Sequence, residues 1–377
     1  MSGSRMAIAL LSVCACSAKI GGANPDSPPG AADAHLDGDG AIIPNPDGPT
    51  SDAPAQVGGG LFSKPMPWTE DIYDAPADTQ SSTIISGLEH VGGWGTGGFQ
   101  MDISIIIQGA DGSTPRVTFV PKDDAWSQQK FGTPDNAEFY TPDCDTPKMP
   151  LPTGGAVEGE NGYACTQDGD CHLLIIDSST RHLYEMWRAD MVSGTLYGGC
   201  TADWDLDAAY DAKLLRGKGC SSADAGGFPI TAMLATPEEV ASGDVKHALR
   251  FILPNTRIRN GMYVAPGTHS TFPTSGPSDA PPYGVRFRLR KDYPLNTLPS
   301  DGARTLAKAL QHYGMFLADG GSVPMTIASD RFRTVTWSSL GVNEQSLLAL
   351  TPSDFEVVGY STPINWKADT NCYRTGL

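Results

Sequence analysis

The chain has 377 residues, of which 43 are glycine, 30 are proline and only 18% are charged, a composition typical of a loop-rich β protein rather than a helical one. Its formal net charge of -17, with no basic cluster to set against the acids, argues against nucleic acid as a partner. The length would hold two average domains, but all-β folds of this size are often one domain.

Residues 1–16 are typical of a secretion signal. Arg5 supplies the positive end, residues 6–13 form an apolar run, and the sequence VCAC that ends at Cys16 resembles a bacterial lipobox. An apolar run this short cannot span a bilayer, which needs about 20 residues. We therefore expect an exported protein whose only membrane contact is a lipid on Cys16, and Ser17 resembles the residue found in lipoproteins sent to an outer membrane and the cell surface. A plain signal peptide or a misplaced start codon are the alternatives.

Residues 17–60 are rich in alanine, aspartate, glycine and proline and have no hydrophobic periodicity. Such a segment cannot bury enough apolar surface to offset its chain entropy, so we expect a disordered tether. The remainder, 61–377, is predicted to be one large β-rich domain.

Six cysteines remain once Cys14 and Cys16 are assigned to the signal and the lipid. An even number in an exported chain predicts disulfides, and a zinc site is disfavoured because no CxxC spacing occurs. We expect three pairs, which are Cys165–Cys171, Cys200–Cys220 and Cys144–Cys372.

Ten segments carry the alternation or the apolar run of a β-strand, and three carry helix signals. The strands are predicted at 99–107, 116–120, 172–177, 183–189, 194–205, 247–253, 283–290, 314–319, 322–328 and 355–358. Hairpins are expected for 99–107 with 116–120, 172–177 with 183–189, and 314–319 with 322–328. Helices are predicted at 207–215, from the capping residue Thr236 to Gly243, and at 300–313. In 247–253, alternation places Ala248, Arg250 and Ile252 on one face. The fold class is therefore mainly β, a β-sandwich or jelly-roll with one or two short inserted helices.

The first candidate site lies in the acid-rich stretch 154–187. On a strand Glu158 and Glu160 would point the same way, and two carboxylates about 5 to 10 Å apart are the minimal machinery of glycoside hydrolysis. Asp170 could replace one of them. His172 would act as a general base if Asp170 or Asp177 oriented it. The alternatives are a solvated acidic surface, a structural calcium site, and a histidine that bonds only to loop backbone.

The second candidate site is a stripe of arginines on the strand at 283–290, where Arg286, Arg288 and Arg290 share a face. Guanidinium groups bind planar oxyanions in a bidentate manner, and with Tyr263 and His269 they would form the Tyr/His/Arg set of polysaccharide lyases. The alternative is the solvent face of an edge strand, paired with the acids of the chain.

Substrate contacts are predicted from aromatic residues and from one glycine-rich loop. Tyr184, Trp187 and Trp204 could stack on sugar rings, or they could be core residues. Asp224 lies in the loop at 219–229, where glycines allow a ligand close to the backbone.

Several segments together resemble a family of secreted bacterial proteins and lipoproteins to which no reaction is assigned. The segments are EGENGYAC, DGDCHLLIID, LYEMW, SADAGGFPI, HALRF, PPYGVRFRLR and YGMFLADGG, and they occur in the same order over most of residues 92–360. The resemblance implies no activity, and no catalytic residue is carried over from it.

We therefore expect a surface protein that acts on or binds a polysaccharide, as a glycoside hydrolase or a polysaccharide lyase. The alternative is a non-catalytic carbohydrate-binding or structural surface lipoprotein. No cofactor is expected, although the acidic loop could hold calcium. Catalysis would require several of the candidate residues to converge, whereas binding would not.

Overall fold

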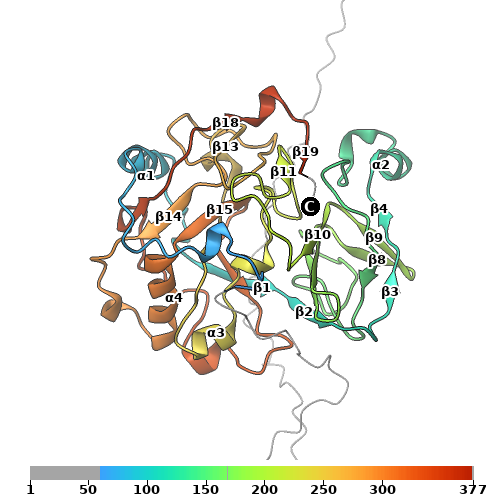
Figure 1. Ribbon diagram of the computed structural model, residues 1–377, viewed down its shortest axis with the longest axis horizontal. Coiled ribbons are helices and arrows are strands. Elements are labelled where there is room, and N and C mark those ends of the chain that lie inside the picture. Colours follow the sequence, from blue (N-terminus) through green and yellow to red (C-terminus); the bar gives the residue numbers. More distant parts are fainter. Residues whose placement is uncertain (1–59, 168, 376–377) are drawn as a thin grey trace, which may run out of the picture.

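The structure, a computed structural model, describes residues 60–167 and 169–375 (Figure 1). The predicted signal, the lipidation site Cys16 and all but the last residue of the predicted tether lie outside the described residues. No helix within the described part of the chain is long and apolar enough to cross a membrane.

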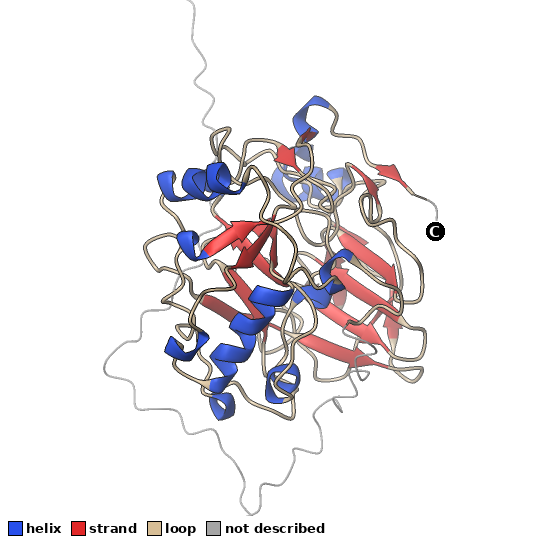
Figure 2. Ribbon diagram, turned by 60° about the vertical axis from the view of Figure 1, so that its left-hand side comes forward, coloured by secondary structure: helices blue, strands red, loops and turns tan. Residues whose placement is uncertain are grey.

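Two β-sheets form the framework, and Figure 2 shows their strands as two groups side by side. The six-stranded sheet has the order β1 (Met101–Ile105), β16 (Met325–Ala328), β12 (Leu249–Leu253), β15 (Met315–Gly320), β14 (Arg286–Leu289) and β17 (Phe355–Val357). The four-stranded sheet has the order β10 (Thr201–Asp205), β7 (His182–Met186), β6 (Leu173–Asp177) and β2 (Ile107–Ala110). The fold is mainly β, as the composition predicts.

The two sheets are joined by one extended stretch of chain, because only Ile106 separates β1 from β2 (Figure 1). The inner faces of both sheets contribute to one shared core, with Leu174 and Trp204 from the smaller sheet and Phe316 and Ala328 from the larger. Both sheets are mixed, since β1 runs parallel to β16, β12 to β15 and β2 to β6. The arrangement is therefore a sandwich with crossovers rather than a purely antiparallel jelly-roll.

Smaller groups of strands, four α-helices and eight short 3-10 helices complete the elements of the described residues. Three of these groups are pairs: β3 (Arg116–Val117) with β5 (Met149–Pro150), β11 (Gly217–Lys218) with β19 (Tyr373–Arg374), and β13 (Met262–Tyr263) with β18 (Ile364–Asn365). The fourth is a three-stranded sheet in the order β4 (Val120–Pro121), β9 (Thr195–Gly198) and β8 (Asp190–Val192). The α-helices are α1 (Ser81–His90), α2 (Asp124–Phe131), α3 (Pro237–Ala241) and α4 (Asp301–His312). The 3-10 helices are Pro67–Thr69, Pro134–Asn136, Thr231–Met233, Asn255–Arg257, Leu295–Thr297, Ser338–Leu340, Pro352–Asp354 and Trp366–Ala368.

The two helices with clear capping signals are confirmed. Thr236 and Glu239 form a reciprocal capping box at α3, and the Ser300 hydroxyl accepts from the backbone N–H of Ala303 at the start of α4. The helix predicted at 207–215 is wrong, because this segment folds into turns closed by a bridge between Asp211 and Leu215. α1 and α2 were not predicted.

Two of the three predicted hairpins are wrong, and the physical reason is the same in both. The segments at 314–319 and 322–328 form β15 and β16, but β12 lies between them in the sheet. The segment at 116–120 pairs through β3 with β5 and through β4 with β9, whereas β2 pairs with β6. In each case a strand from elsewhere in the sequence takes the place of the local partner. The hairpin of β6 and β7 is confirmed.

All six predicted cysteines form disulfides, but only one predicted pair is right. Cys165 pairs with Cys171, whereas the other bonds are Cys144–Cys200 and Cys220–Cys372. The antiparallel pairing of β11 with β19 brings Cys220 beside Cys372 at the C-terminal end. Three disulfides indicate an oxidising environment.

Candidate active site

A row of polar residues crosses the inner face of the six-stranded sheet. On β12, Leu249 and Phe251 pack into the core on the outer face, so Arg250 faces the shared core between the sheets. Thr326 of β16 lies opposite Arg250 on one side and opposite Asp102 of β1 on the other. Three neighbouring strands thus align the arginine Arg250, the hydroxyl of Thr326 and the carboxyl of Asp102 across the sheet.

A register shift adds a second acid to this face. Phe251 is opposite Leu317, but the next residue, Ile252, is opposite Asp319, so Ala318 has no partner on β12. A bulge of this kind re-aims the side chains that follow it. Asp319 consequently shares the face of Arg250 and accepts from Arg250 Nη2 at 2.8 Å.

Arg250 is also held by the glycine-rich loop at 219–229. Its Nη2 and Nε donate to the two carboxylate oxygens of Asp224 at 2.9 and 3.2 Å, and its Nη1 donates to Thr326 Oγ1 at 3.0 Å. The loop can approach because Gly227 has a φ of +83° and a Cβ there would stand 2.0 Å from Thr268 Oγ1.

Glu158 and His172 are joined three times. Glu158 Oε2 lies 2.7 Å from His172 Nδ1 and accepts from the His172 backbone N–H at 3.2 Å, while the Glu158 backbone N–H donates to His172 O at 2.9 Å. The other ring nitrogen of His172 lies 3.3 Å from the carbonyl of Ala223, in the same loop as Asp224. Glu158 reaches this position from a turn, with Gly159 at a φ of +69°.

The pairing fixes both groups in their charged forms. Burial alone lowers the pKa of His172, but the adjacent Glu158 carboxylate raises it to about 9. Burial alone raises the pKa of Glu158, and the histidine lowers it below its ordinary value. The raised pKa argues against the role of general base that the sequence suggested for His172, and the acid that holds His172 is Glu158 rather than Asp170 or Asp177.

Two neighbouring acids have the opposite shift. Burial and the charge of Asp224 raise the pKa of Asp319 well above its ordinary value. Burial and the charge of Glu158 raise the pKa of Asp102, against the hydrogen bonds that Asp102 accepts from Ser104. A carboxyl whose pKa is lowered and two carboxyls whose pKa values are raised thus lie around Arg250, and pKa values that differ in this way are typical of acid and base pairs in active sites.

These groups form what we call the Arg250 cluster. Its members are Asp102, Glu158, Asp170, His172, Asp224, Arg250 and Asp319. Asp170 belongs to it because its charge raises the pKa of both His172 and Asp319.

The cluster has a buried side and a solvent-facing side. The side chains of Arg250 and Asp224 are 3% and 0% exposed, whereas those of Glu158 and Asp319 are 16% and 18% exposed. Trp187 is half-buried beside it and donates through Nε1 to Asp170 at 3.1 Å. A ligand could therefore reach Glu158 and Asp319, two carboxyl groups whose pKa values are shifted in opposite directions.

Glu160 does not join Glu158, contrary to the prediction from strand geometry. Its carboxylate accepts from the backbone N–H groups of Thr166 and Gln167 and from the Thr166 hydroxyl, so it closes the loop. Glu160 also lies near Cys165 and Cys171, but the two sulfurs are bonded to each other and offer no thiolate to a metal.

The fold does not bring Tyr263 and His269 together with the arginines as the predicted lyase set requires. Tyr263 is 3% exposed and packs in the outer core, and His269 bonds through Nδ1 to the carbonyl of Ala225 at 2.8 Å. Burial lowers the pKa of His269 to about 4. Tyr263 is therefore part of the packed interior, and the ring of His269, which is half-buried, is bonded to the backbone.

The three arginines of the stripe do not form one lyase clamp with Tyr263 and His269, and the stripe is not the solvent face of an edge strand, because only Arg290 of the three is exposed. β14 lies between β15 and β17, and Arg286 and Arg288 are covered by the chain at 70–75. Arg288 donates to Glu356 and to three backbone carbonyls of that segment, so it holds the segment in place.

Two of the three predicted stacking residues are core residues. Trp204 is fully buried, and its Nε1 donates to the buried Glu185. Tyr184 is 6% exposed and accepts from Arg116. Both side chains are buried, which leaves the half-buried Trp187 as the member that can meet a ligand.

Asp102, Arg250 and Asp319 are site residues that the sequence analysis did not single out. The signal was available for Arg250, since a charged residue within a strand that is apolar on both faces must find a buried counter-ion. Asp319 could not be placed without the register shift.

No protein-family model matches this chain, and no curated protein or solved structure is similar to it.

Proposed function

We propose that this protein is an exported glycoside hydrolase whose active site is the Arg250 cluster. The observation that carries the proposal is convergence, because four separate parts of the chain bring Asp102, Glu158, Arg250 and Asp319 together where the two sheets meet. Catalysis requires such residues to lie close together, whereas a surface that only binds sugar does not require it. The burial of Tyr263 and Arg288 favours hydrolysis over the lyase reaction.

The proposed reaction uses the two carboxylates with opposite protonation. Asp319 donates its proton to the oxygen of the leaving sugar as the glycosidic C–O bond breaks, and Glu158 acts on the other side of the ring as nucleophile or as the base that activates water. Water supplies the hydroxyl that ends on the cleaved sugar and the proton that restores Asp319. Arg250 and His172 hold the two acids in place.

Trp187 is the proposed contact for the sugar ring. It is half-buried beside Asp170, and the exposed part of its ring would cover the apolar face of a pyranose while its Nε1 stays bonded to the protein.

We also propose that the enzyme acts at the cell surface, where a lipid on Cys16 anchors it to the membrane and residues 17–60 form a tether between the anchor and the domain. The disulfides support an oxidising location, and the tether would reach about 35 Å on average. Cys16→Ser should release the protein from the membrane fraction, and retention of that variant would contradict the anchor.

The experiment is a panel of neutral and uronic polysaccharides with the purified protein. New reducing ends report hydrolysis, and absorbance from unsaturated uronate reports a lyase. Wild type should give reducing ends without that absorbance, and Glu158→Gln should lower the rate by at least about 100-fold.

Glu160→Gln is the matched control, because it changes the neighbouring glutamate, whose carboxylate bonds to Thr166 and Gln167 of its own loop. Its rate should stay within about threefold of wild type. Retention of the protein on an insoluble glycan without any product would favour the binding module instead, and equal loss in both variants would remove Glu158 from the reaction.

A further inference from the structure

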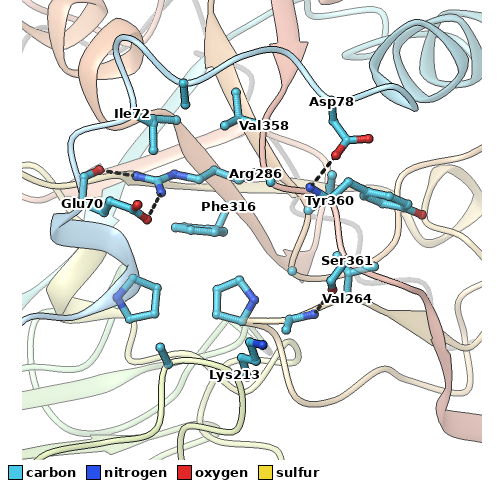
Figure 3. A pocket seen from close by; sticks show the side chains of 18 of the residues that line it. Glu70, Ile72, Asp78, Lys213, Val264, Arg286, Phe316, Val358, Tyr360 and Ser361 are labelled. Atoms are coloured by element: carbon cyan, nitrogen blue, oxygen red, sulfur yellow. Dashed lines mark hydrogen bonds and ion pairs between the residues drawn. The ribbon is translucent and has the colours of Figure 1, made fainter.

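A cavity of about 620 Å³ is lined by none of the residues of the Arg250 cluster, although its lining residue Phe316 lies opposite Arg250 in the sheet (Figure 3). Its walls come from the chain at 67–79, the loop at 264–266, strands β14 and β15, and the segment at 358–361. Most of the lining is apolar, and Phe316, Val264 and Val358 are among the side chains that face it.

The wall holds one buried charge, the guanidinium of Arg286. Its side chain is 8% exposed, and its central carbon lies 5.0 Å from the centre of the Phe316 ring. Arg286 Nε donates to the carbonyl of Tyr313 at 2.9 Å, and Nη2 donates to the carbonyl of Glu70 at 2.7 Å. Both of these partners are neutral.

The counter-ion of Arg286 is weak. The nearest contact with a carboxylate is 3.5 Å, from Nη1 to Glu70 Oε2, and the Glu70 side chain is 72% exposed. By contrast, Arg250 has the buried Asp224 in a bidentate contact. A buried cation is costly unless a partner neutralises it, and here burial lowers the pKa of Arg286 to about 10.

The other charged residues at the cavity do not change its expected preference for an anionic ligand. Asp78 accepts from the backbone N–H groups of Gln80 and Tyr360, so its carboxylate is held at the opposite end in Figure 3. Lys213 is exposed at the rim and adds positive potential to it.

We propose that this cavity binds a small organic carboxylate with an apolar body. The carboxylate would displace the Glu70 side chain and pair with Arg286, since a guanidinium matches a carboxylate through two parallel hydrogen bonds. The body would pack on the more accessible apolar residues of the lining, among them Pro67, Pro76 and Pro266. The site is separate from the proposed hydrolysis and does not depend on it.

The test uses phenylacetate as the probe and phenylacetamide as its neutral match, in ligand-observed NMR titrations of the purified protein. An anionic fragment of this size should bind with a dissociation constant on the order of 1 mM, and the amide should bind at least about tenfold more weakly. Cyclohexanecarboxylate and hexanoate extend the probe to other body shapes.

Variants of Arg286 and Glu70 then test whether the ligand carboxylate pairs with Arg286 in place of Glu70. Arg286→Met should weaken phenylacetate at least about tenfold, while Arg290→Met, an exposed arginine beyond the end of β14, should not change it. Glu70→Gln should tighten binding about threefold or more, because it removes the competing carboxylate.

The exposed position of Glu70 makes its variant informative even if Arg286→Met folds poorly. Absence of binding by all three acids, equal affinity for acid and amide, or unchanged or weaker binding by Glu70→Gln would each overturn the proposal.

Discussion

Asp319 lies 2.8 Å from Arg250 because the strand that carries it skips one residue of its register. With regular alternation, Ala318 would face the shared core and Asp319 would face the opposite side of the sheet. The bulge thus decides which side of the sheet has a second acid. The position of the proposed proton donor depends on this backbone irregularity.

Removing Arg250 should destabilise the fold strongly. Its side chain is 3% exposed and Asp224 is fully buried, so Arg250→Met would leave a buried carboxylate unpaired. We expect a loss of about 3–5 kcal/mol in the free energy of unfolding. Chemical denaturation measures it, with the exposed Arg290→Met as the control, and a loss equal to that of the control would show that Asp224 finds another partner.

The pair of Glu158 and His172 should make stability depend on pH. The pKa of His172 in the fold, about 9, lies above its ordinary 6.5, so its contribution is complete below about pH 6.5 and is lost as the pH rises through 9. The pKa of Glu158 lies below its ordinary 4.5, so its contribution is present above 4.5 and is lost as the pH falls.

The unfolding free energy of wild type minus that of His172→Gln measures this contribution. It should be largest between about pH 4.5 and 6.5 and should shrink by about pH 10. A difference that stays constant over this range would mean that the histidine is not protonated in the fold.

The disulfides Cys220–Cys372 and Cys165–Cys171 should contribute different amounts to the free energy of unfolding, because they close loops of very different length. Cys220–Cys372 closes 152 residues and Cys165–Cys171 closes 6. Loop-closure entropy gives about 5 kcal/mol for the long span and about 2 kcal/mol for the short one. Calorimetry of the two double serine variants measures the difference, and an equal loss of stability would contradict the entropic account.

Trp187 should matter for glycan binding beyond its contribution to the fold, where its ring packs against two core clusters. Trp187→Ala is expected to weaken binding of the cleaved glycan about tenfold, from the loss of ring stacking. Trp126 on α2 is the control, since it is also half-buried but contacts Lys122 and Lys130. If Trp126→Ala weakened binding as much, Trp187 would not be the specific contact.

Local signals account for the parts of the fold that the sequence predicted. The β6–β7 hairpin has its turn between two apolar runs, and α3 has a capping box within four residues. By contrast, β12 enters between β15 and β16, and no feature of the turn at Gly320–Gly321 opposes a hairpin there. Pairing between distant strands is decided by the whole sheet, so a local pattern cannot reveal it.

The candidate site follows the same division. Glu158, Asp170 and His172 lie close together in sequence, and their stretch was predicted as a site. Arg250 was correctly placed on the face opposite Leu249, but its partners Asp224 and Asp319 come from other segments. Only the fold shows that these groups meet.

The most direct test of the proposed active site is the rate of Asp319→Asn on two substrates with the same sugar. One is the natural glycan, whose leaving group needs a proton, and the other is an aryl glycoside with an acidic phenol, whose leaving group does not. If Asp319 is the proton donor, the variant should lose at least about 100-fold on the glycan and less than about tenfold on the aryl glycoside. An equal loss on both substrates, or no loss on the glycan, would contradict the account.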